Sequence, residues 1–210
     1  LDRGIRRDQI IGLENKKIIV HAPELFKNSE LLNLCSDNQE LLDNSIKSLQ
    51  DVCDYCDNLA QLLEYEGRIK VVANVGGFST HSFKSEDEKS HLYDKVIQSI
   101  DEVSQVSTKI IPQNMAPFPW HFGGQRYQNI FIDSDEIVSF CKRGYNICLD
   151  TAHLSMNCKF FNKKFEDEFL KLLPYSDHLH LSDADGLNGE GVKLGTGDID
   201  FKFVMNNISK

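Results

Sequence analysis

The feature that most constrains the fold is the alternation of short apolar runs with longer segments of helical periodicity. Five apolar runs are interpreted as buried strands, and they cover residues 18–21, 69–74, 109–112, 145–150 and 178–181. Helical spacing of apolar residues, capping residues and glycine or proline stops predict helices over residues 39–66, 91–106, 133–144, 165–173 and 201–207. This order is typical of parallel βα units.

Two architectures are built from such units, an open doubly wound sheet and a closed (β/α)₈ barrel. The first strand is not followed by a G-x-G-x-x-G loop, which disfavours a dinucleotide-binding open sheet. A polar residue stands where each strand ends, and in a barrel those ends converge on one mouth. These residues are His21, Asn74, Gln113, Asp150 and His180.

We therefore predict an α/β fold of the (β/α)₈ TIM-barrel type, with residues 1–210 forming a single domain. A complete barrel of this kind needs about 250 residues. We expect the barrel to be partial in this chain, with the first strand and the last two strands absent.

Charge and composition exclude some function classes. Lys and Arg number 23 against 32 Asp and Glu, a net charge of −9, which argues against an extended nucleic-acid footprint. No run of about 18 apolar residues is present, so no membrane span is expected. The six cysteines are scattered, which favours reduced thiols and a cytoplasmic location over a disulfide framework. The Cys53-x-x-Cys56 pair lies inside a helical pattern, where a redox or zinc role is not favoured.

Imidazole and carboxylate groups gather at the predicted strand ends and suggest a metal site. Asp150 and His153 directly follow one strand, His180 ends the next, and His21 ends an earlier one. Carboxylate oxygen and imidazole nitrogen are ligands that suit zinc, manganese or magnesium. For each residue taken alone, the alternative is a buried polar group with a satisfied hydrogen bond.

Two loops are candidates for ligand contact. Residues 113–126 are rich in proline, glycine and aromatic side chains. This loop either closes over a substrate, with Trp120 as an apolar wall and Arg126 as a hydrogen-bond donor, or packs rigidly on the barrel. Residues 186–197 are glycine-rich and precede a helix, so they either cradle an anion or serve only tight turns. Glu190 in this second loop is a candidate acid, base or metal ligand.

Five pieces of sequence, in the right order over residues 18–205, together resemble the xylose isomerase-like (β/α)₈ superfamily. This superfamily contains sugar isomerases and epimerases as well as endonuclease IV-type DNA-repair enzymes. The pieces are His21-Ala22-Pro23, Asn74-Val-Gly-Gly77, Gln113-Asn114-Met115, Leu149-Asp150-Thr-Ala-His153 and His178-Leu-His180-Leu-Ser-Asp183 with the glycines that follow. The last two pieces are the most specific.

The chain departs from the family pattern at three positions. Gln113 replaces the fourth-strand metal carboxylate, and Asn74 replaces the third-strand histidine of the repair enzymes. The Asp-x-His of their third zinc site is Glu190-Gly-Val192 here. At these three positions the chain therefore lacks residues that form the three-zinc site of the repair enzymes.

The resemblance implies a divalent-metal-dependent sugar or sugar-phosphate isomerase/epimerase that acts on an α-hydroxycarbonyl. It implies an ion (Mn, Zn, Mg or Co) bound by Asp150 and His180, with Gln113 as a weaker third ligand. It implies proton-handling roles for Glu190, His153 and His21. The substrate contacts expected with these are Trp120, Arg126, Asn74 and Asn114.

Two alternatives stay open. One is an endonuclease IV-like phosphodiesterase, which the charge and the three departures disfavour. The other is a degenerate barrel that binds a sugar or a partner protein without turnover. It is suggested by Gln113, which stands where the family has a metal-binding carboxylate. The expected partner is a small sugar or sugar phosphate; nucleic acid is disfavoured, no membrane contact is expected, and a homo-oligomer is left open.

Overall fold

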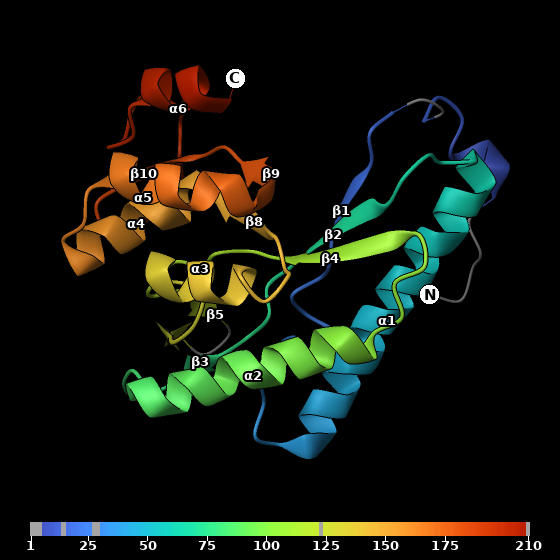
Figure 1. Cartoon of the computed structure of the whole chain (residues 1–210), viewed down its shortest axis with the longest axis horizontal. Helices are drawn as coiled ribbons and strands as arrows, with labels where there is room; N and C mark the ends of the chain where they lie inside the picture. The colour runs from blue at the N-terminus through green and yellow to red at the C-terminus, as the bar shows by residue number, and fades with distance from the viewer. Residues whose placement is uncertain (1–5, 14–15, 27–29, 122–123, 209–210) are drawn as a thin grey trace. The chain divides into compact units, whose positions relative to one another are not determined.

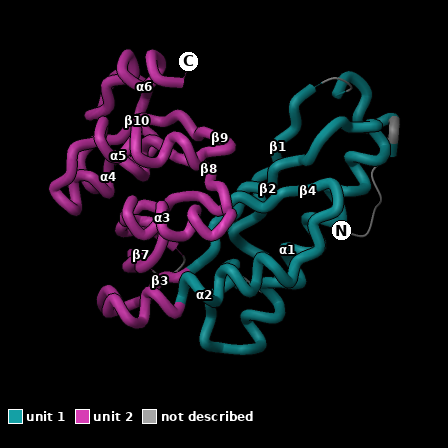
Figure 2. Tube along the Cα trace, in the orientation of Figure 1, with its two compact units in different colours: residues 1–76, 92–111 teal, residues 77–91, 112–210 magenta. Residues whose placement is uncertain are grey.

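The computed structural model of the chain describes residues 6–13, 16–26, 30–121 and 124–208 (Figure 1). These residues fall into two compact units, which Figure 2 colours separately. Unit 1 comprises residues 1–76 and 92–111, and unit 2 comprises residues 77–91 and 112–210.

Unit 1 is built on a three-stranded sheet in the order β1 (Ile19–His21), β2 (Ile69–Ala73) and β4 (Thr108–Pro112). β1 and β2 pair in parallel. The helix α1 (Gln39–Leu63) lies against β2. It begins where the Asn38 side chain accepts a hydrogen bond from the Leu41 N–H, which satisfies one of the free donors of the first turn.

Unit 2 contains a second parallel pair, β8 (Ile147–Asp150) and β9 (Ser176–His180). Directly after β4, Gln113 forms an isolated parallel bridge with Cys148 of β8. The helix α4 (Thr151–Phe161) packs against α5 (Phe165–Leu172) and β10 (Asp183–Asp185). The remaining elements of the described chain are η1 (Arg7–Gln9), β3 (Phe78–Ser79), α2 (Glu86–Glu102), β5 (Trp120–His121), β6 (Gly124–Gln125), β7 (Tyr127–Gln128), α3 (Ser134–Cys141), η3 (Leu173–Tyr175), β11 (Gly189–Val192) and α6 (Phe201–Ile208).

The five predicted strands and five predicted helices are present in the predicted order, but the sequence analysis missed the helix α4 and several short strands outside the parallel pairs. Residues 151–158 of α4 are all buried, so no polar face is left to give the sequence a helical period. The helix α2 begins at Glu86, five residues before the predicted start at His91. Ser85 and Glu88 cap each other's backbone N–H groups there, which is a capping box.

The closed barrel is not formed by the strands of the described residues. They make one three-stranded sheet and four two-stranded pairs, and these pairings do not join into a ring. The predicted loop over 113–126 contains the short strand pair β5–β6, with residues 122–123 outside the described chain. The glycine-rich segment contains β11, which pairs with β10.

All six cysteines lie in the described chain, and each is a buried thiol. Burial raises the pKa of Cys53 to about 11 and the pKa of Cys56 to about 12. Both thiols of the Cys-x-x-Cys pair are therefore protonated at neutral pH, whereas a redox dithiol needs an accessible thiolate. None of the described helices combines the length and the apolar character that crossing a membrane requires.

Candidate functional site

One face of the β8–β9 pair carries the candidate metal ligands. The register pairs Cys148 with His178 and Asp150 with His180. Because side chains alternate along a strand and paired residues share a face, these four side chains lie on the same side of the pair. Asp150 and His180 are the last residues of their strands.

Asp150 has one oxygen committed to the fold and one directed to a histidine. Its Oδ1 accepts the His153 N–H at 3.0 Å and so caps α4. Its Oδ2 lies 3.8 Å from His180 Nδ1, which is longer than a hydrogen bond. Two atoms that share an ion through bonds of about 2.1 Å lie at most about 4.2 Å apart. The pair therefore has the spacing that one shared ion requires.

The backbone of Asp150 is fixed by Asn114. The Asn114 side chain accepts the Asp150 N–H at 2.6 Å and donates to the Asp150 carbonyl at 3.1 Å. Asn114 is fully buried. Both of its side-chain groups are used to position Asp150, whereas the sequence predicted a contact with substrate.

His153 and Glu190 form an ion pair beside Asp150. The His153 Nδ1–H donates to the Asn114 carbonyl at 2.7 Å, and Nε2–H donates to Glu190 Oε1 at 3.0 Å. Burial alone would lower the pKa of His153. The Glu190 hydrogen bond, the charges of Asp150 and Glu190 and the Asn114 carbonyl raise that pKa to about 9. The hydrogen bond from His153 in turn lowers the pKa of Glu190, so the pair is an imidazolium and a carboxylate at neutral pH.

Gln113 contributes a buried side-chain oxygen that has no hydrogen-bond partner among the residues that the structure describes. Its side chain is 4% exposed, and its Nε2 lies 3.4 Å from His153 Nδ1. Within the described chain, no hydrogen-bond donor reaches its Oε1. An unsatisfied buried acceptor is costly, and a bound cation is one way to satisfy it. The site thus offers a carboxylate oxygen, an imidazole nitrogen and an amide oxygen.

The glycine-rich segment binds an anion, and this anion belongs to the chain itself. The Asp183 carboxylate accepts four backbone N–H groups, from Ala184, Gly195, Gly197 and Ile199, at 2.9 to 3.2 Å. Burial alone would raise the pKa of Asp183, but these four donors lower it. A Cβ atom on Gly197 would lie 2.2 Å from the Ala184 carbonyl oxygen, so the close approach requires glycine.

The predicted substrate loop is partly packed and partly open. The ring of Phe118 contacts those of Phe83, Tyr127 and Phe160 at centroid distances of 5.3 to 5.9 Å. Trp120, by contrast, is 74% exposed, and Arg126 is half-buried. The loop is therefore anchored at Phe118, while the indole of Trp120 remains accessible to a ligand.

The structure brings six of the predicted site residues together within unit 2, namely Gln113, Asn114, Asp150, His153, His180 and Glu190. His21 and Asn74 belong to unit 1. His21 is exposed, with Nδ1 2.8 Å from the Ala22 carbonyl, and Asn74 donates its amide to the Glu24 carboxylate. Their roles stay predictions.

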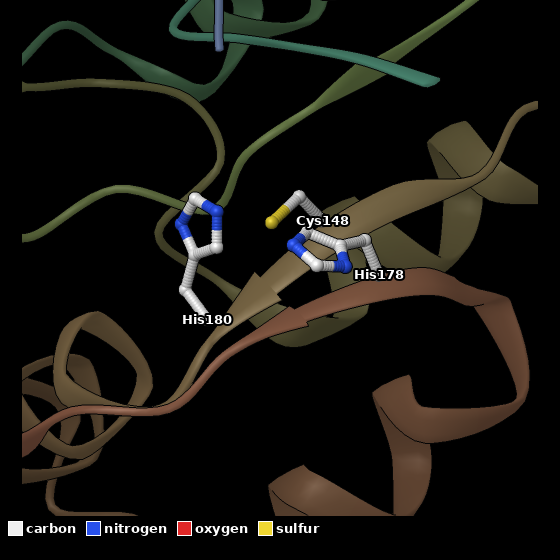
Figure 3. A group of neighbouring side chains, drawn as sticks. All are labelled: Cys148, His178 and His180. Carbon is white, nitrogen blue, oxygen red and sulfur yellow. The ribbon is translucent and has the colours of Figure 1, made fainter. Parts of the chain in front are cut away.

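The sequence analysis did not identify two further candidate metal ligands. Cys148 and His178 lie beside His180, and one ligand atom from each of the three falls within 4.8 Å of the other two. Figure 3 shows the three side chains converging from β8 and β9. The His-x-His spacing of 178 and 180 places both rings on one face of a strand. The sequence did not show that Cys148 pairs with His178.

Comparisons with known proteins identify the family of the chain. The sequence matches the family model of the xylose isomerase-like TIM barrel over residues 8–210. The chain belongs to that family. No match was found among curated protein sequences.

Several solved structures resemble this member of the family. A D-tagatose 3-epimerase-like protein superposes with a TM-score of 0.65 and 21% identity, over 97% of this chain and 68% of that one. D-allulose 3-epimerase from Methylomonas sp., solved with D-allulose, superposes with a TM-score of 0.56 and 12% identity, over 84% of this chain and 55% of that one. 3-Keto-D-glucoside 4-epimerase from E. coli superposes with a TM-score of 0.55 and 14% identity, over 91% of this chain and 66% of that one. At these identities the likeness establishes the fold, and the chain spans about two thirds or less of these proteins.

Proposed function

We propose that this protein is a divalent-metal-dependent sugar or sugar-phosphate isomerase/epimerase that acts on an α-hydroxycarbonyl. The observation that carries the proposal is the hydrogen-bonded network that joins Asp150, His153 and Glu190 and sets Asp150 3.8 Å from His180. Similar structures include sugar 3-epimerases and a 4-epimerase. We assign the chain to a single domain, residues 1–210, that supplies part of a (β/α)₈ barrel.

The residues present fit a divalent ion. Asp150 and His180 have the spacing of two ligands of one ion, and Gln113 Oε1 is a buried acceptor without a donor in the described chain. A carboxylate, an imidazole and a neutral amide suit Mn²⁺, Zn²⁺, Mg²⁺ or Co²⁺. When bound, the ion polarises the substrate carbonyl and stabilises the negative charge that develops on its oxygen.

Residues of this chain accept the substrate proton and position the metal ligands. His153 keeps Glu190 ionised, and an ionised Glu190 can accept a proton from the carbon next to the carbonyl. The Glu190 side chain is 54% exposed, so it is accessible to a ligand. Asn114 acts through Asp150 as a positioning residue, and the exposed Trp120 supplies an apolar surface for the sugar ring.

Exchange of a substrate proton with solvent tests this proposal. The chain is incubated with D-allulose or D-tagatose and Mn²⁺ in D₂O, and loss of the proton next to the carbonyl is followed by NMR. We expect exchange that chelation abolishes and that Glu190→Gln slows at least about 100-fold. Asp185→Asn, which changes an exposed carboxylate on the neighbouring strand, is the matched control. Metal-independent exchange, or none with any ketose tested, would contradict the proposal.

Gln113 favours one alternative, a barrel that binds a sugar without turnover. A neutral amide is a weaker ligand than a carboxylate. If the alternative holds, sugars bind to the chain but no proton exchanges. In the enzyme, Gln113→Glu raises the Mn²⁺ affinity about tenfold or more, because it adds a charge to the ligand set.

A further inference from the structure

A second set of donor atoms lies on the same face of β8 and β9 as Asp150. It consists of Cys148, His178 and His180, whose ligand atoms lie within 4.8 Å of one another (Figure 3). Cys148 and His178 are paired across the two strands, one position before the pair Asp150 and His180 on that face. The rings of His178 and His180 lie 5.1 Å apart and nearly perpendicular.

We propose that Cys148, His178 and His180 form a zinc site distinct from the carboxylate set of Asp150 and Gln113. One thiolate and two imidazoles are ligands that zinc accepts, with a fourth position left for water or substrate. In a tetrahedral site these atoms lie about 3.3 to 3.6 Å apart. Small side-chain rotations are enough to close the present arrangement onto an ion.

The chemistry of the donor atoms explains how this set selects its ion. Cys148 is fully buried and offers a soft sulfur ligand. A hard ion such as Mg²⁺ has little affinity for sulfur, whereas zinc binds thiolate strongly. His180 belongs to both sets, so the nature of the ion decides whether oxygen ligands or sulfur and nitrogen ligands hold it.

The site is accessible from solvent. His178 and His180 are half-buried. His178 also lines a cavity of about 460 Å³ together with Ser176, Leu179 and Asn207. The two histidine rings are therefore partly exposed, whereas Cys148 is fully buried.

Cobalt substitution tests this inference on the whole chain. Co²⁺ bound to a thiolate gives a sulfur-to-metal charge-transfer band in the near ultraviolet, and Co²⁺ bound only to oxygen and nitrogen does not. We expect the band in the unmodified protein and in Asp150→Asn. It disappears in Cys148→Ser, and His178→Gln weakens Co²⁺ binding at least about tenfold.

Cys141→Ser is the matched control. Cys141 is also a buried thiol whose pKa burial raises to about 12, but it lies in α3, outside the set. This variant therefore keeps the band. If Cys148→Ser does not fold, zinc X-ray absorption of the unmodified protein decides: one sulfur at about 2.3 Å is expected.

A cobalt complex without the band, a band retained in Cys148→Ser, or a zinc shell of oxygen and nitrogen alone would overturn the inference. None of these results bears on proton exchange from the sugar. The zinc site and the proposed epimerase activity can therefore fail separately.

Discussion

Asp150 and Asp183 are both buried carboxylates in unit 2, but their oxygens are used differently. Asp183 accepts four backbone N–H groups, so both of its oxygens are bound within the fold. Asp150 accepts one N–H on Oδ1, while Oδ2 faces His180 at 3.8 Å. We infer that Asp183 is a structural anion and that Asp150 has an oxygen left for chemistry.

The difference shows that burial alone does not identify a functional carboxylate. Asp183 is the more deeply buried of the two, at 0% exposed against 7% for Asp150. What separates them is the number of internal donors. Substitutions that remove one role at a time therefore test the comparison.

The largest effect is expected for Asp183→Ala. It removes the anion and leaves four backbone N–H groups without their acceptor, those of Ala184 and Ile199 in buried residues. We expect the free energy of unfolding to fall by about 3–5 kcal/mol, measured by urea denaturation. Asp185→Ala, an exposed neighbour in β10, should change it by less than about 0.5 kcal/mol. Equal losses in the two variants would refute the structural role of Asp183.

Asn114→Ala should come next. It leaves the buried Asp150 N–H without its acceptor, at a cost of about 2 kcal/mol. It also releases the backbone that sets the position of the carboxylate. We expect Mn²⁺ affinity to fall in calorimetric titration of the folded variant. Unchanged affinity would show that Asn114 does not position Asp150.

Acid should remove the stabilisation that the Asp183 carboxylate provides to the folded chain. Because the folded-state pKa of Asp183 is lowered, its contribution to stability is present above the unfolded value of about 3.9 and is lost as the pH falls below it. Denaturation between about pH 3 and pH 6 should therefore show a shallower pH dependence in Asp183→Asn than in the unmodified chain. Parallel curves would mean that its pKa is not lowered.

The smallest change in stability is expected for Asp150→Asn. Asparagine caps a helix about as well as aspartate, so the free energy of unfolding should change by less than about 1 kcal/mol. The loss of charge should nevertheless weaken Mn²⁺ binding at least about 100-fold. A large loss of stability with intact binding would reverse the roles that we assign to Asp150 and Asp183.

The sequence predicted most elements because each carries a local signal. The Asp133 side chain caps α3 with bonds to the Asp135 and Glu136 N–H groups, and Asp200 accepts the N–H groups of Lys202 and Phe203 at the start of α6. The helix α4 also has a capping aspartate, Asp150, but its first eight residues are all buried, so its sequence shows no amphipathic period.

Predictions for the site depended on tertiary pairing. Strand ends identified Asp150 and His180, since parallel strands bring their carboxyl ends together. The pairing of Cys148 with His178 follows from the register of β8 and β9, which the sequence does not encode locally. The acceptance of four N–H groups by Asp183 likewise depends on how the chain turns at Gly195 and Gly197.

Anomalous diffraction from crystals of the chain grown with Mn²⁺ tests the central claim most directly. The account predicts an ion bonded to Asp150 Oδ2 and to a His180 ring nitrogen at about 2.2 Å, with Asp183 still bound to its four N–H groups. An ion bound at Asp183, or an Asp150 carboxylate without an ion at saturating Mn²⁺, would contradict it.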